Sequence, residues 1–153
     1  MMIKAIQPTS PCADSMRRLW EYLDRQLPEA EESPTVGQAM SNAACDIAES
    51  LRARAMLVPT ATGRTASAVA RLRPHQPIIA LSHHRDTVQR LALEWGVTPI
   101  LMPEAHDVHD LWNRSVEAAQ TTDLLGSGDL VVITAGTAVN FPGTTNVIKV
   151  ERV

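Results

Sequence analysis

The chain has 153 residues, of which 44% are hydrophobic and 20% charged, a balance that fits one globular domain and argues against a disordered or membrane-embedded chain. Its 14 Lys and Arg stand against 17 Asp and Glu, giving a net charge of −3, so no general attraction to nucleic acid or anionic lipid is expected. We therefore expect neither nucleic acid nor a membrane as a partner. Any anion must be held by a local site.

Cysteine usage favours a reducing compartment. Cys12 and Cys45 are the only cysteines and form no CxxC pair, so neither a metal knuckle nor a disulfide framework is expected. The start, MMIKAIQPTSPC, lacks the apolar run of a signal peptide. These features predict a cytoplasmic protein.

The first 34 residues read as an arm followed by an attachment helix. Pro8 and Pro11 exclude a regular helix over residues 1–13, whereas residues 14–27 carry apolar side chains at helical spacing. The acidic segment Pro28–Pro34 then breaks the pattern. We predict two parts, residues 1–34 as arm and attachment helix and residues 35–153 as an α/β domain.

Strand and helix patterns alternate along the second part. A strong amphipathic helix is predicted over Val36–Arg54, with an apolar stripe at i, i+4, i+7 and i+8. Later helices are predicted over 65–72, over 86–95 with Trp95 facing inward, and from Asp107, whose side chain is placed to cap the helix. Trp112 falls on the apolar stripe of that last helix and is predicted to be core. Strands are predicted over residues 55–58, 77–81, 98–102, 129–136 and 146–153.

This alternation predicts an α/β three-layer sandwich with a mostly parallel five-stranded sheet. No helix separates the last two strands, so the terminal strand is expected to lie antiparallel at an edge. In such sheets, ligands bind beyond the carboxyl ends of the strands. Two loops rich in Gly and Thr are expected there, Thr60–Thr65 and Gly136–Thr145.

The first loop has the composition of a phosphate cradle. Backbone N–H groups at a helix start, threonine hydroxyls, a glycine and an arginine are the donors that such a site needs. The residues concerned are Thr60, Ala61, Thr62, Gly63, Arg64 and Thr65. The alternative interpretation is that Thr62 merely caps the helix and the rest is turn.

The second loop is long for a link between neighbouring strands. Its glycines and threonines suit a segment that folds over a ligand, and the residues concerned are Gly136, Thr137, Gly143 and Thr144. A plain hairpin is the alternative.

Other motifs give no catalytic, cofactor or metal assignment. GxGxxG, GxxxxGK[ST] and GxSxG are all absent from the sequence, and no paired carboxylates lie near a base. His106 and His109, with the neighbouring aspartates, have metal-ligand spacing, but a solvated helix face is the favoured interpretation. Cys45 lies on the apolar stripe and is interpreted as a small buried hydrophobe.

From about Thr35 to Val153 the sequence resembles the C-terminal domain of pyruvate kinase. The resemblance rests on the loop TATGRTA, the run from Arg73 to Ala80, SGDLV at 127–131 and PGTTNVIKV at 142–150. It implies an effector site for a sugar phosphate at Thr60–Thr65, closed by Gly136–Thr144, and homo-oligomer formation through the terminal strand.

The resemblance also implies that a catalytic barrel is a possible partner chain. No segment here matches that barrel, so the chain alone is not expected to be a pyruvate kinase. Leu111 stands where some members activated by fructose 1,6-bisphosphate have an arginine, and Arg114 lies one turn away. Two further hypotheses are a phosphosugar isomerase-like enzyme, with Glu94 or Glu104 as the nearest candidate bases, and a purely structural oligomerisation module.

Overall fold

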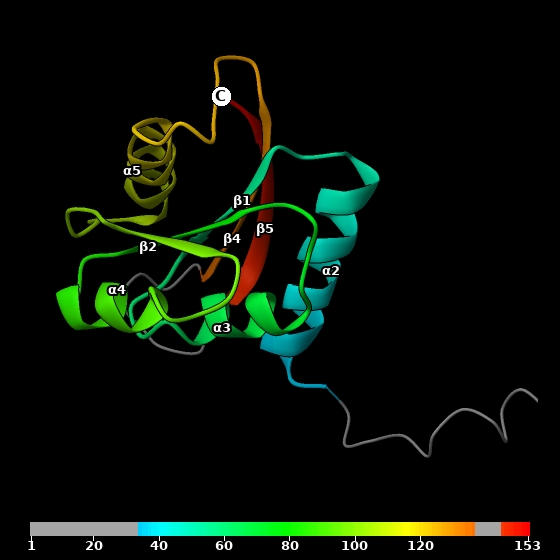
Figure 1. Ribbon diagram of the computed structural model, residues 1–153, viewed down its shortest axis with the longest axis horizontal. Helices are drawn as coiled ribbons and strands as arrows, with labels where there is room; N and C mark the ends of the chain where they lie inside the picture. Colours follow the sequence, from blue (N-terminus) through cyan, green and yellow to red (C-terminus); the bar gives the residue numbers. More distant parts are fainter. Residues whose placement is uncertain (1–33, 137–144) are drawn as a thin grey trace, which may run out of the picture. The chain divides into compact units, whose positions relative to one another are not determined.

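The computed structural model describes residues 34–136 and 145–153 (Figure 1). The chain separates into two units, Met1–Ser33 and Pro34–Val153, and all the described residues belong to the second. The helix predicted over 14–27 lies outside the described residues, as do Thr137, Gly143 and Thr144 of the second loop. The predicted division at residue 34 stays a prediction.

Helices and strands alternate from α2 to β4. The elements are α2 (Val36–Ser50), β1 (Ala55–Pro59), α3 (Arg64–Arg71), β2 (Ile78–Ser82), α4 (Arg85–Leu91), β3 (Val97–Leu101), α5 (Val108–Gln120), β4 (Leu130–Gly136) and β5 (Thr145–Arg152). β1 and β2 are buried along their whole length, which explains why both read as uninterrupted apolar runs.

The strands form one sheet of order β3-β2-β1-β4-β5. β1 pairs parallel with β2 and β4, and β2 pairs parallel with β3. β5 pairs antiparallel with β4 and lies at the edge, as the missing intervening helix predicted. The predicted α/β fold with a mixed sheet is confirmed.

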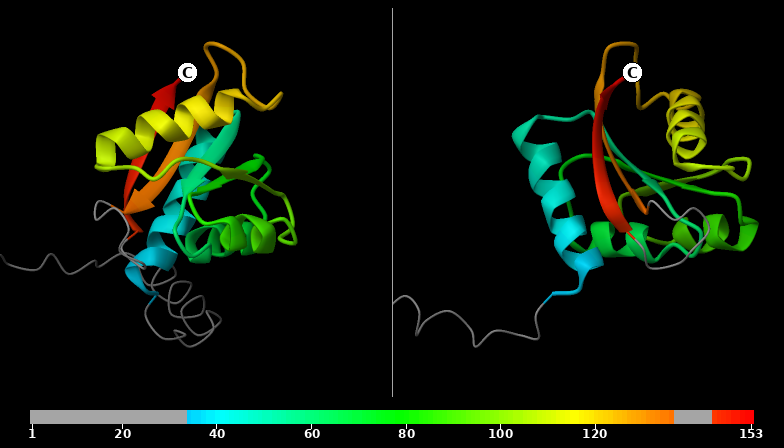
Figure 2. Two further views of the ribbon diagram at one scale, coloured as in Figure 1. Left: turned by 90° about the vertical axis from the view of Figure 1, so that its left-hand side faces the viewer. Right: turned by 180° about the vertical axis from the view of Figure 1, so that it is seen from behind.

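Helices cover both faces of the sheet (Figure 2). On one face α2, α3 and α4 bury a core of small side chains, with Ala44, Ala48 and Ala66 packed on Met56 and Val58. On the other face the helical layer is α5, whose Ala119 meets the alternate residues of β1, β2 and β4. Trp112 is partly buried against this second core, as its place on the apolar stripe of α5 predicted.

The fourth helix ends earlier than its apolar pattern predicts. α4 stops at Leu91, and the next backbone bonds, Leu93 N to Arg90 O and Glu94 N to Leu91 O, span three residues and turn the chain toward β3. Trp95 is consequently 65% exposed, so the prediction that it faces inward is wrong. Gly96 follows with φ +72°, the left-handed conformation that the sequence predicted for it.

Helix starts are set by local capping. Asp107 caps α5, because its side chain accepts a hydrogen bond from Asp110 N at 2.8 Å. α2 begins with a reciprocal capping box between Thr35 and Gln38, a signal that the sequence carries in TVGQ. No helix among the described residues is long and apolar enough to cross a bilayer.

Candidate functional site: the loop between β1 and α3

The Thr60–Thr65 loop begins where β1 leaves the sheet. Thr60 N donates to Leu81 O of β2 at 2.8 Å, which anchors the first loop residue to the neighbouring strand. Thr60 Oγ1 in turn accepts a hydrogen bond from Gly63 N at 2.9 Å, which closes a tight turn over residues 60–63. The threonine at position 60 therefore shapes the loop.

Gly63, and not Thr62, is the N-cap of α3. It has φ +82°, and no side chain caps the helix. The first helical bond runs from Ser67 N to Gly63 O at 2.9 Å, so the N–H groups of Arg64, Thr65 and Ala66 come before the helical ladder begins. The alternative interpretation, with Thr62 as the cap, is wrong. The start of α3 keeps donor groups that a capping side chain would have used.

Residues of α4 brace the same loop from behind. Thr87 Oγ1 donates to Ala61 O at 2.9 Å, and Arg90 Nη2 donates to Thr62 O. These bonds occupy two carbonyl oxygens whose partial negative charge would otherwise oppose an anion. Sequence reasoning missed both residues, because nothing local links a helix at 85–91 to a loop some 25 residues earlier.

Close packing explains why position 63 is glycine. A Cβ at Gly63 would lie 3.2 Å from Arg90 Nη2 and 3.2 Å from Leu91 Cδ2. The positive φ adds a second reason, since L-residues with a Cβ are strained in the left-handed region. Gly63 thus fixes both the conformation of the loop and its distance from α4.

The second predicted loop begins and ends beside the first. Gly136, the last residue of β4, pairs with Thr145, the first residue of β5. The hydroxyls of Thr65 and Thr145 share a hydrogen bond at 2.8 Å, so the start of α3 touches the start of β5. Gly136 and Thr145, between which the second loop runs, therefore lie at the same end of the sheet as the first loop, as the positions of the two loops after β1 and β4 predicted.

The charged residues near this edge have different surroundings. Arg64 is exposed at the first position of α3. Leu111 is partly buried against the core between α5 and the sheet. Arg114 Nε donates to Asp110 Oδ1 at 2.7 Å. Hydrogen bonds from Arg114 and then from the backbone N–H of His106 lower the pKa of Asp110. The cation nearest in sequence to Leu111 is thus held in an ion pair on α5.

The remaining candidates are distributed elsewhere. Glu94 accepts a hydrogen bond from Ser67 Oγ at 2.8 Å, and Glu104 is exposed between β3 and α5. His109 packs edge-on against Trp112. Within residues 34–136 and 145–153, no group of three or more His, Cys, Asp and Glu residues is arranged to hold a metal.

Cys45 is half-buried and packs against the core between the sheet and helices α2, α3 and α4. Burial, with a smaller contribution from the charge of Asp46, raises the pKa of its thiol to about 11. The thiolate is the nucleophilic form, so the raised pKa disfavours reaction of this side chain at neutral pH. Its surroundings agree with the interpretation of Cys45 as a small hydrophobe.

Comparison with known proteins decides the family. A model of the pyruvate kinase alpha/beta domain matches residues 38–151. The chain belongs to the pyruvate kinase alpha/beta domain family. The resemblance on which the sequence analysis rested is thereby confirmed, and the Thr60–Thr65 loop is a loop of this domain.

Relatives of this pyruvate kinase domain are longer proteins. Pyruvate kinase 2 of a Synechocystis species is 41% identical over 134 residues, which cover 87% of this chain and 23% of the relative. Pyruvate kinases of Methylorubrum extorquens and Geobacillus stearothermophilus are 35% and 38% identical, over 99% and 97% of this chain and 32% and 26% of their own lengths. The chain thus spans about a quarter to a third of these curated relatives.

Proposed function

We propose that this domain is a regulatory module of pyruvate kinase type that binds a phosphorylated small molecule at the Thr60–Thr65 loop. The observation that carries the proposal is the start of α3, where Gly63 leaves the helix without a side-chain cap. The helix dipole places about half a positive charge there, and a phosphate satisfies such N–H groups well. Arg64 adds a full charge at the first helical position.

The bracing by α4 supports the same ligand class. With Ala61 O and Thr62 O occupied by donors from Thr87 and Arg90, the loop has few acceptors left to repel an anion. The contact between Thr65 and Thr145 ties the loop to the ends of the segment at Gly136–Thr144. In the proposal, that segment closes over the bound effector.

Calorimetric titration tests the site. Fructose 1,6-bisphosphate, glucose 6-phosphate and inorganic phosphate are each titrated into the domain at low ionic strength. We expect saturable binding of at least one of them, and loss of that binding in the double variant Thr62→Ala, Arg64→Ala. The matched control is Thr98→Ala, Arg71→Ala, which removes the same side-chain types away from the loop. Binding that survives in the first variant contradicts the proposal.

We further propose that the domain associates with a second copy through β5. This strand is eight residues long, lies at the sheet edge and exposes 41% of Val150. Long edge strands present unpaired backbone groups to another chain. Sedimentation should show an oligomer that Val150→Glu weakens and that Leu101→Glu, on the opposite edge strand, leaves intact. If the wild-type protein stays monomeric at high concentration, the proposed association through β5 is wrong.

The proposal includes a catalytic barrel, in the same chain or another, as the partner that is regulated. The relatives that this domain matches are named pyruvate kinases and are several times its length. Leu93 and Trp95, 89% and 65% exposed, supply an apolar surface for such a contact. A cytoplasmic location is also proposed, on the sequence alone.

A further inference from the structure

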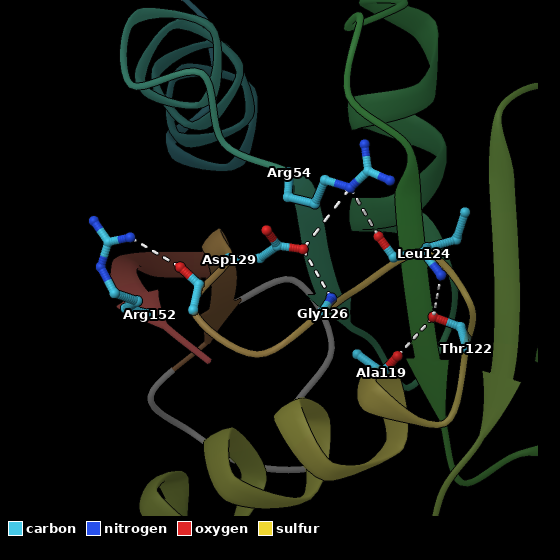
Figure 3. A network of polar contacts seen from close by, with 8 residues as sticks. Arg54, Ala119, Thr122, Leu124, Gly126, Asp129 and Arg152 are labelled. Carbon is cyan, nitrogen blue, oxygen red and sulfur yellow. Dashed lines mark hydrogen bonds and ion pairs between the residues drawn. The ribbon is translucent and has the colours of Figure 1, made fainter.

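A second concentration of positive charge lies at the end of the sheet that is opposite to the Thr60–Thr65 loop, where β1 and β4 begin and β5 ends (Figure 3). A cleft of about 490 Å³ is found there, and its lining includes Arg52, Arg54, His75, Gly128, Asp129 and Arg152. Figure 3 shows Arg54 and Arg152 on either side of Asp129. The volume is within the range of small-molecule pockets.

Backbone carbonyls hold two of the guanidinium groups in place. Arg54 Nε donates to Leu124 O at 3.1 Å, and Arg152 Nη1 donates to Gly128 O at 2.8 Å. A carbonyl orients a guanidinium without cancelling its charge, and each arginine has five N–H donors. Arg152 therefore keeps donors and a full charge for a further partner, whereas Arg54 keeps donors but shares its charge with Asp129.

The cleft carries more positive than negative charge. Its carboxylate, Asp129, accepts from Gly126 N at 2.8 Å and lies 3.8 Å from Arg54 Nε. Among the side chains that line the cleft, this one carboxylate stands against three arginines and the exposed His75. This local excess is opposite in sign to the net charge of −3 of the chain.

Arg52 has a backbone conformation that favours glycine. Its φ is +51°, and it follows the C-cap of α2 in a Schellman motif. In this motif Arg52 N donates to Glu49 O at 3.0 Å, and Ala53 N donates to Ala48 O at 2.8 Å. An arginine in the last helical turn would complement the helix dipole without this strain, yet that turn has no basic residue. Within the described residues, no hydrogen bond or ion pair of its side chain offsets the cost. Strain kept at such a position points to a use for the side chain.

We propose that this cleft is a second anion site, separate from the Thr60–Thr65 loop, and that it takes a phosphate-bearing small molecule. Guanidinium groups match phosphate oxygens in pairs, and the mostly polar lining suits a compact, highly charged ligand better than an apolar one. Arg52 and Arg152 contact the phosphate, and Arg54 adds charge while keeping Asp129 engaged.

Titration with inorganic pyrophosphate, followed by amide chemical shifts on the full chain at low ionic strength, tests the proposal. We expect saturable shifts at residues 52–54 and 126–129, and an affinity reduced about 10-fold or more in Arg52→Gln, Arg152→Gln. The control Arg71→Gln, Arg85→Gln makes the same change in charge outside the cleft and should keep the affinity. Shifts confined to residues 60–65, or an unchanged affinity in the first variant, would overturn the proposal.

A glycine substitution separates ligand binding from stability. Arg52→Gly relieves the left-handed strain, so it should raise the melting temperature by about 2–5 °C while weakening pyrophosphate binding. Arg73→Gly is a comparison variant, because Arg73 has φ +50° at the equivalent position after α3 and does not line the cleft. The Arg73 guanidinium lies 5.6 Å from the centroid of the Trp95 ring, and the variant loses this contact. Its gain in melting temperature should therefore be smaller, and pyrophosphate binding should be unchanged. If Arg52→Gly binds like the wild type, the arginine serves no anion and the proposal fails.

The proposals for the two anion sites can be tested independently of each other. Loss of binding in Thr62→Ala, Arg64→Ala concerns the Thr60–Thr65 loop, and the shifts at residues 52–54 and 126–129 should persist in that variant. Persistence of those shifts supports the second site even if no sugar phosphate binds the loop. Their disappearance in the loop variant would show that the cleft has no binding of its own.

Discussion

Three helices, α3, α4 and α5, begin after the carboxyl ends of β1, β2 and β3, and the starts of α3 and α5 are built in opposite ways. α5 carries its own negative groups, because Asp107 caps it and Asp110 lies in its first turn. α3 starts at Gly63 without a side-chain cap and with Arg64 as its first residue. In α5 the protein's own carboxylates satisfy the backbone N–H groups at the helix start, whereas in α3 these groups stay available to an external anion. α4 also starts without a side-chain cap, but Asp86 lies in its first turn. Among these three helices α3 therefore has neither a side-chain cap nor an acidic first turn, which supports the proposal that an anion binds there.

The largest expected effect is that of Gly63→Ala, which changes the start of α3 itself. The left-handed φ and the 3.2 Å contacts of the new Cβ should lower the free energy of unfolding by about 1–3 kcal/mol and displace the loop. Urea unfolding measures it. Gly96→Ala is the control, with φ +72° and no atom within 4 Å of its Cβ. Equal losses in both variants would show that contact with α4 does not matter at Gly63.

Giving α3 a negative charge of its own should make it resemble α5. Arg64→Glu places a carboxylate in the first turn, where it complements the dipole and competes with a bound phosphate. We expect sugar-phosphate affinity to fall about 10-fold further than in Arg64→Gln, with unchanged or slightly higher stability. Calorimetry and thermal melts measure the two quantities. Equal affinities in the Glu and Gln variants would contradict the role given to the uncapped helix start.

A smaller effect is expected from the support behind the loop. Arg90→Met removes the donor to Thr62 O, so the loop loses one of its two bonds to α4. Effector affinity should fall about 3–10-fold, with about 1 kcal/mol lost from the free energy of unfolding. Arg85→Met, at an exposed position on the same helix, is the control. An Arg90 variant with full affinity would mean that the loop keeps its shape without this bond.

The smallest effect is expected at α5. Asp110→Asn removes the ion pair with Arg114, and the lowered pKa of Asp110 means that its contribution is present above the ordinary carboxyl pKa and is lost as the pH falls through the lowered value. The difference in melting temperature between wild type and variant should therefore shrink as the pH falls from 6 toward about 3. A constant difference across that range would show that the carboxylate charge is not what stabilises the start of α5.

Sequence patterns predicted the strands because buried parallel strands read as apolar runs, and β1 and β2 agree with prediction within one residue. The end of α4 was not predictable in this way, since Trp95 continues the helical apolar spacing while the chain is already turning toward β3. The spacing of apolar residues along a helix does not show where the chain must turn to reach its next strand.

The sequence by itself determined the α/β class, the antiparallel last strand, the family and the loop where an anion is expected to bind. The family follows from the resemblance carried by the motifs at 60–66, 73–80, 127–131 and 142–150. The other features follow from local composition or from the order of elements along the chain. Only the tertiary structure decided which residue starts α3, which side chains brace the loop and that three arginines share a cleft at the other edge. The physical reason is that these residues are far apart along the chain. Arg90 reaches Thr62 O, and Arg52 and Arg152 line one cleft, only when the chain has folded into the sheet order β3-β2-β1-β4-β5.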